Sequence, residues 1–95
     1  MNIGKAIKYL RKKHELNQQQ LAKEAGLTQT ALSQFESGAR RPNAQSLKKL
    51  TDFFKVPEIV IYMLATEVND VPDAKKEMFE KIFPNMQNLL ISLFE

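Results

Sequence analysis

Residues 18–35, with the sequence QQQLAKEAGLTQTALSQF, decide the fold of this chain. Apolar residues recur at spacings of three and four on either side of Gly26, which predicts two short helices. Gly26 can adopt the left-handed conformation that ends a helix, and Thr28 can cap the helix that follows. We therefore expect a helix, a tight turn and a second helix over about residues 29–37.

Two helices that cross steeply at a short turn need small residues where they meet. Ala22 supplies a small side chain at the crossing, and Gly26 supplies the reversal of the chain. The space between the helices would then be filled by Leu21, Ala25, Leu27, Leu32 and Phe35. This spacing is the helix-turn-helix pattern.

The same periodicity continues on both sides of this motif. It predicts a first helix over about residues 2–14, a fourth helix capped by Asn43 and a fifth that begins at Pro57. The pattern stops at residues 69–73, where we expect a linker.

The composition is that of one globular domain with a modest core. The chain has 95 residues, no cysteine and no apolar run that approaches the ~20 residues of a membrane span. Its first residues lack a signal-peptide pattern, so we expect a cytoplasmic protein. Residues 1–66 carry eleven Lys and Arg against five Asp and Glu, whereas residues 67–95 carry three against six. The basic part is the one suited to face a polyanion.

The sequence resembles the DNA-binding domains of phage repressors and Cro, the XRE family, over residues 3–64. The resemblance is carried by Arg11, Gln18, Leu21-Ala22, Ala25-Gly26, Leu32-Ser33, Glu36, Gly38, Pro42 and Leu47. It implies an all-α, lambda-repressor-like domain of five helices whose third helix enters the major groove of double-stranded DNA. It also implies that Gln18 contacts a phosphate and that Arg11 and Glu36 form a structural ion pair.

The helix expected over residues 29–37 has one polar side without charge. At 100° per residue, Gln29, Thr30, Ser33 and Gln34 fall on this side, and apolar residues fall opposite. Amide groups can make paired hydrogen bonds to adenine, and a threonine methyl can contact thymine. We therefore interpret these four residues as base-contacting; the alternative is an ordinary hydrated helix surface.

Neighbouring residues are candidates for contacts with the DNA backbone. Asn17 could share the phosphate contact of Gln18, although helix capping also explains this asparagine. Arg40 and Arg41 follow the third helix in a short basic loop, and we expect at least one of them to reach a phosphate. Arg11 could also touch a phosphate, although its main role is expected in the ion pair.

The C-terminal segment lies outside the resemblance and is expected to be helical from Met78 to Phe94. Pro84 predicts either a kink or two short helices. A stripe this apolar must be buried, either on its own domain or against a partner. We favour pairing with a second copy, which would place two recognition helices one turn of DNA apart. The dimerisation residues would be Phe79, Ile82, Phe83, Met86, Leu89, Leu90, Leu93 and Phe94.

These features predict a DNA-binding domain over residues 1–66 and a dimerisation or partner-binding segment over residues 67–95. The predicted function is recognition of a palindromic operator by a homodimer, with repression as the outcome. One alternative is an antitoxin-type regulator whose C-terminal helix binds a second small protein; another is an adaptor that does not read DNA. No catalytic motif, cofactor site or metal site is predicted, and His14 is expected to complete the first helix.

Overall fold

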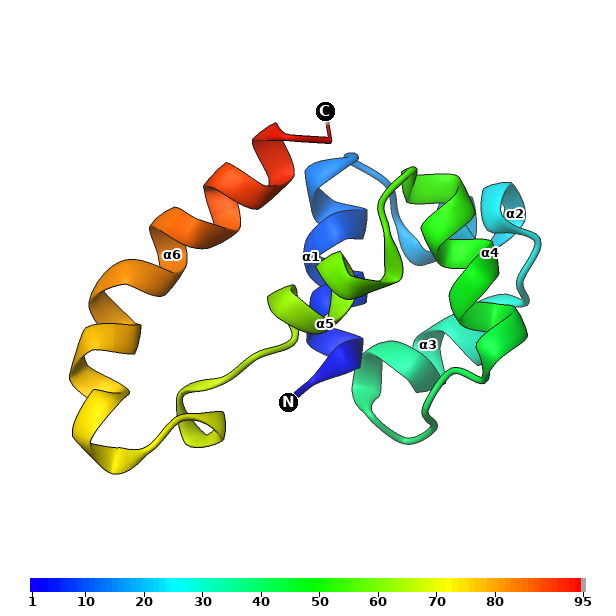
Figure 1. Ribbon diagram of the computed structural model, residues 1–95. Coiled ribbons are helices and arrows are strands. Elements are labelled where there is room, and N and C mark those ends of the chain that lie inside the picture. Colours follow the sequence, from blue (N-terminus) through cyan, green and yellow to red (C-terminus); the bar gives the residue numbers. More distant parts are fainter. Residues whose placement is uncertain (95) are drawn as a thin grey trace.

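The computed structural model describes residues 1–94, which form helices joined by short loops (Figure 1). Two 3-10 turns, η1 (Val68–Asp70) and η2 (Asp73–Lys75), connect the last two α-helices. The all-α prediction is confirmed. The α-helices are α1 (Ile3–Lys13), α2 (Gln18–Ala25), α3 (Gln29–Ser37), α4 (Ala44–Phe54), α5 (Glu58–Leu64) and α6 (Lys76–Ser92).

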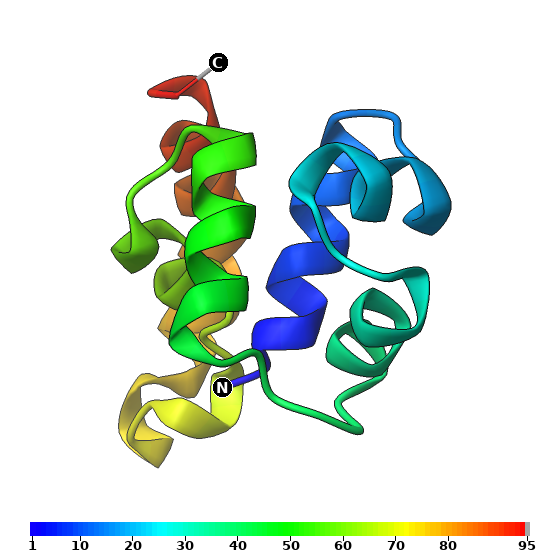
Figure 2. The same ribbon diagram turned by 90° about the vertical axis from the view of Figure 1, so that its right-hand side faces the viewer.

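Helix α1 lies between α3 and α5 and packs against both (Figure 2). Helix α2 packs against α3 and α4, so the first five helices enclose one core. Burial of each large apolar side chain stabilises the folded domain by about 1.5–3 kcal/mol. Because α3 packs against this core, its angle to α2 at the turn is fixed. The largest fully buried side chains are Ile7, Leu10, Leu21, Leu32, Phe35, Leu50 and Ile61.

The helix ends follow the capping residues that the sequence predicted. Asn17 forms a capping box with Gln20, in which each side chain bonds the backbone N–H of the other residue. The Thr28 hydroxyl accepts a hydrogen bond from the backbone of Ala31, and Asn43 caps α4 in the same way. Gly26 ends α2 in the left-handed region at φ 75°. The predicted boundaries of α3 are therefore confirmed.

Gly4 brings α1 close to the C-terminal end of α3, a contact that the sequence reasoning missed. A Cβ atom at Gly4 would overlap the carbonyl oxygen of Phe35 and would lie 2.9 Å from that of Glu36. Gly4 is buried, and both carbonyls are backbone atoms that cannot move aside easily. The absence of a side chain therefore sets the distance between the two helices.

Helix α6 is one continuous helix that contains Pro84. The alternative of two short helices is therefore wrong. Proline removes one backbone hydrogen bond, the one that would reach the carbonyl of Glu80. Both Pro84 and Glu80 are exposed, so water can solvate this carbonyl and the helix continues.

The connection between α5 and α6 is tied to the start of α1. The Met1 amino group lies 2.7 Å from Oδ2 of Asp70 and 3.4 Å from Oε1 of Glu67. The hydrogen bond with Asp70 raises the pKa of the Met1 amino group, and the same contact lowers the pKa of Asp70.

Among residues 1–94, no helix combines the length and hydropathy needed to cross a membrane.

Candidate nucleic-acid interface

The exposed side of α3 carries the four residues that the sequence predicted as base-contacting. Gln29, Thr30 and Ser33 are exposed, and Gln34 is half-buried. Together with Gln18 of α2, they line one shallow hollow of about 310 Å³. The turn at Gly26 therefore brings the first residue of α2 to the outer face of α3.

The opposite side of α3 is anchored in the core. Leu32 and Phe35 are buried there, so α3 cannot rotate about its axis without exposing them. The outer face offers carboxamide and hydroxyl groups, each of which can donate and accept hydrogen bonds. Such groups match the mixed donor and acceptor edges of base pairs in a major groove.

Behind this face, Arg11 and Glu36 form the ion pair that the resemblance implied. Arg11 Nε lies 2.8 Å from Oε2 of Glu36, and Nη2 lies 2.9 Å from Oε1. Arg11 Nη1 also donates to the carbonyl oxygen of Leu16 at 2.8 Å. The side chains of Arg11 and Glu36 are 11% and 3% exposed. The hydrogen bonds to Glu36 raise the pKa of Arg11. The pair joins α1 to α3.

The same carboxylate also binds Gln18. Gln18 Nε2 donates to Oε1 of Glu36 at 3.2 Å, which links α2 to the pair between α1 and α3. The sequence reasoning did not find this contact. Eighteen residues separate the two side chains, and no periodic pattern relates them. Only the crossing angle of α2 and α3 brings them together.

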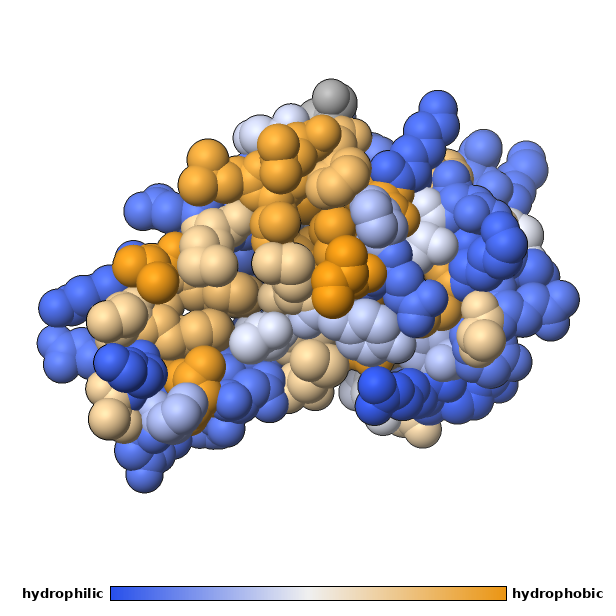
Figure 3. All heavy atoms as spheres, viewed as in Figure 1, coloured by the Kyte–Doolittle hydropathy of each residue, from blue (hydrophilic) through white to orange (hydrophobic). Residues whose placement is uncertain are grey.

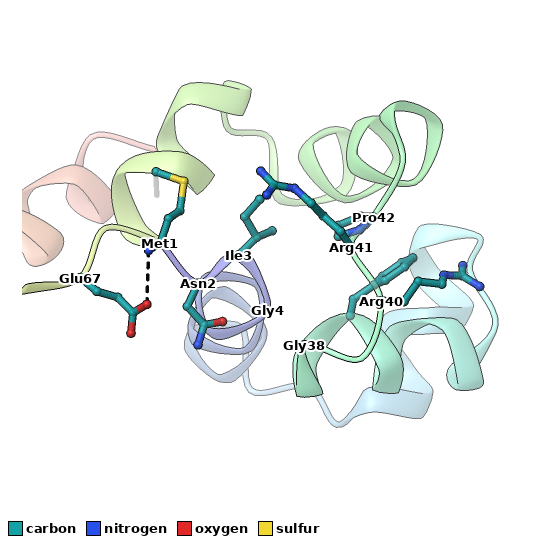
Figure 4. Close-up of a pocket in the computed structure, with 10 residues that line it drawn as sticks. Met1, Asn2, Ile3, Gly4, Gly38, Arg40, Arg41, Pro42 and Glu67 are labelled. Carbon is teal, nitrogen blue, oxygen red and sulfur yellow. Dashed lines mark ion pairs between the residues drawn. The ribbon is translucent and has the colours of Figure 1, made fainter. Parts of the chain in front are cut away.

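Arg40 and Arg41 extend from the loop after α3 in opposite directions (Figure 4). The Arg40 guanidinium lies over the Phe35 ring, 5.1 Å from its centroid, and Arg41 extends the other way. The loop borders a hollow of about 300 Å³ that also includes Gly4 and Glu67. Both arginines are exposed, so both remain available to an anion.

Comparison with known proteins agrees with this geometry. A helix-turn-helix family model matches residues 7–61, more than half of the chain. The chain belongs to the helix-turn-helix family. This membership confirms the XRE-type resemblance seen in the sequence, and the matched residues include all of α2, α3 and α4.

One relative of this helix-turn-helix protein is the HTH-type transcriptional activator BcrR of Enterococcus faecalis. The two are 39% identical over 56 residues. This region is 59% of the present chain and 28% of the relative, so the chain spans about a quarter of that protein's length. No solved structure gave a significant match.

The eight predicted dimerisation residues divide between two sides of α6. Phe79, Phe83 and Leu90 are half-buried on the side that faces the helix-turn-helix domain. The buried residue Ile91, which the prediction omitted, joins the main core. Five residues remain exposed by 38–74%, namely Ile82, Met86, Leu89, Leu93 and Phe94.

The exposed apolar surface follows α6 toward α5, whereas the surface over α2, α3 and α4 is mostly hydrophilic (Figure 3). On a helical wheel, an arc of about 80° holds the exposed residues Met78, Ile82, Met86, Leu89 and Leu93, with Ile91 on the opposite side. A groove of about 240 Å³ runs beside this stripe, between α6 and the residues Met63, Thr66 and Val71.

His14 ends α1, as predicted. The centroid of its ring lies 5.1 Å from the centroid of the Phe54 ring. Within residues 1–94, no three His, Asp or Glu side chains gather in an arrangement that could hold a metal ion.

Proposed function

We propose that this helix-turn-helix protein is a transcription regulator that recognises a DNA sequence with α3 in the major groove. The observation that carries the proposal is the outer face of α3, where Gln29, Thr30, Ser33 and Gln34 surround one hollow with Gln18. A helix face without charge cannot bind phosphates by charge attraction, but it can discriminate base edges by hydrogen bonds. Each paired amide contact to a base would contribute about 1–3 kcal/mol of discrimination.

Residues at the margin of this face are proposed to hold the DNA backbone. Gln18 and Asn17 stand at the N-terminus of α2, where backbone N–H groups and the helix dipole favour an anion. Arg40 and Arg41 would contact phosphates on the far side of α3. Arg11 is engaged with Glu36, and any phosphate contact of Arg11 would be secondary to that pair.

We further propose that the protein acts as a homodimer on a palindromic operator. The exposed stripe on α6 lies opposite Ile91, which packs in the core, and each of its residues is at least 40% exposed, so folding of one chain leaves it open to water. Residues 82–94 carry no charged side chain, and the exposed amide of Asn85 stands beside the stripe. Amides pair with copies of themselves, since they both donate and accept. Over residues 82–94, a second α6 would therefore match this surface without unpaired charge.

Two-fold pairing of α6 would place two α3 helices on one duplex. Within one chain, α3 and α6 lie on different sides of the molecule, with α1 and α5 between them (Figures 1 and 2). Two half-sites about 34 Å apart would then form the operator. Bound in the cytoplasm over a promoter, such a dimer would repress transcription by excluding the polymerase. The relative named as an activator matches in only 28% of its length.

The experiment is selection of bound duplexes from a random library by the purified protein, with the mass in solution measured alongside. We expect an enriched palindrome and the mass of two chains. Enrichment of a palindrome only from a complex with a second protein would favour the antitoxin-type regulator. No enrichment at moderate salt would contradict DNA reading and favour a protein-binding adaptor.

A further inference from the structure

We propose that Glu36 is a positioning residue for DNA recognition, which fixes the orientation of the Gln18 side-chain amide at its proposed phosphate contact. This inference rests on the proposed function and adds a role for a residue that faces no DNA itself. It is drawn from the hydrogen bond between Gln18 Nε2 and Oε1 of Glu36.

The orientation follows from the chemistry of the two groups. An ionised carboxylate only accepts hydrogen bonds, so the Gln18 amide must turn its NH2 group toward Glu36. One N–H of that group and the carbonyl oxygen then remain for the hollow beside α3. With a neighbour that both donates and accepts, the amide could turn over and offer either end.

The ion pair with Arg11 makes this arrangement compatible with nearby DNA. A lone carboxylate behind a phosphate contact would repel the phosphate. Two hydrogen bonds from Arg11, at 2.8 and 2.9 Å, place a positive charge directly against Glu36. The Glu36 side chain is only 3% exposed, so water does not compete for its oxygens. The pair therefore supplies a fixed acceptor with little net charge.

The decisive variant is Glu36→Gln, which keeps the size of the side chain but removes the constraint on Gln18. Its matched control is Glu24→Gln, an exposed carboxylate on α2 whose loss changes the net charge equally. We expect Glu36→Gln to bind the selected duplex about 3–10-fold more weakly than Glu24→Gln, as expected for one lost hydrogen bond. Thermal melting of each variant reports folding separately.

A double-mutant cycle with Gln18→Met separates positioning from folding. If Glu36 acts through Gln18, Glu36→Gln should change affinity by less than about twofold when Met occupies position 18. An equal loss in both backgrounds would overturn the inference. If the wild-type protein itself prefers no duplex, the proposed function fails instead, and the two failures are thereby distinguished.

A measurement on the wild-type protein does not depend on how the variants fold. In 15N-labelled protein without DNA, the side-chain amide of Gln18 should be ordered on the ps–ns timescale. The exposed side chain of Gln19, one residue along α2, serves as the internal control. Equal mobility of the two amides would overturn the inference.

Discussion

The backbone of α1 at Gly4 touches the carbonyl oxygen of Phe35 in α3 so closely that no side chain fits between them. The helix that carries the proposed base-reading face is therefore positioned by a glycine on another helix. Phe35 is also buried and supports Arg40, so this contact lies close to both the core and the basic loop.

Gly4→Ala should destabilise the protein, although alanine is the better helix former. Alanine would gain up to about 1 kcal/mol of helix propensity, but forcing a methyl group against a backbone carbonyl costs about 1–3 kcal/mol. Chemical denaturation should show a net loss, while Lys5→Ala at the exposed neighbouring position should change stability by less than about 0.5 kcal/mol. A rise in stability for Gly4→Ala would show that α1 and α3 are further apart.

Breaking the Arg11–Glu36 pair from one side should cost more than replacing both residues. Arg11→Met or Glu36→Leu leaves one charge without its partner in a nearly buried site, at a cost of about 3–5 kcal/mol. The double variant leaves no charge behind and should recover part of this loss. Denaturant titration of the three variants measures the coupling, and strictly additive losses would mean that the pair contributes little.

Much of this fold could be predicted because its signals are local. Asn17, Thr28 and Asn43 cap the helices that they precede, and Gly26 takes the left-handed conformation that its position required. The polar face of α3 proposed to read bases followed from a helical wheel, and the buried side of α3 is confirmed.

What could not be predicted depends on contacts between distant residues or on special backbone conformations. The bond between Gln18 and Glu36 and the close approach at Gly4 exist only once three helices pack together. Lys55 ends α4 in the left-handed region without a glycine to indicate it. The apolar pattern of α6 predicted that its apolar side chains would be buried. It did not predict that Ile91 would pack on the core while Leu93 stays 74% exposed.

The phosphate contacts proposed for Arg40 and Arg41 should appear in the salt dependence of DNA binding. The logarithm of the binding constant falls linearly with the logarithm of the salt concentration, and removing one such contact makes this slope less steep by about 0.9. We expect this change for Arg40→Gln, Arg41→Gln or both, whereas Lys81→Gln on α6 should leave the slope unchanged. If neither variant changed the slope, the arginines of this loop would make no phosphate contact and would only face solvent.

The exposed stripe on α6 should hold two copies together. Replacing Leu89 and Leu93 by Asp places two charges in the proposed interface, so the protein should become a folded monomer. Asn88→Asp adds a charge to the same helix outside the stripe and should remain a dimer. Sedimentation equilibrium distinguishes the two masses, and a wild-type protein that is already monomeric would contradict the pairing.

Recognition of bases by α3 is tested by the ratio of affinities for the selected duplex and for a scrambled duplex. For Gln29→Ala and Gln34→Ala, we expect this ratio to fall about 5–150-fold per lost base contact, while binding to scrambled DNA is retained. Gln19→Ala, an exposed glutamine on α2, should leave the ratio unchanged. An unchanged ratio for both α3 variants would contradict recognition of bases by this helix.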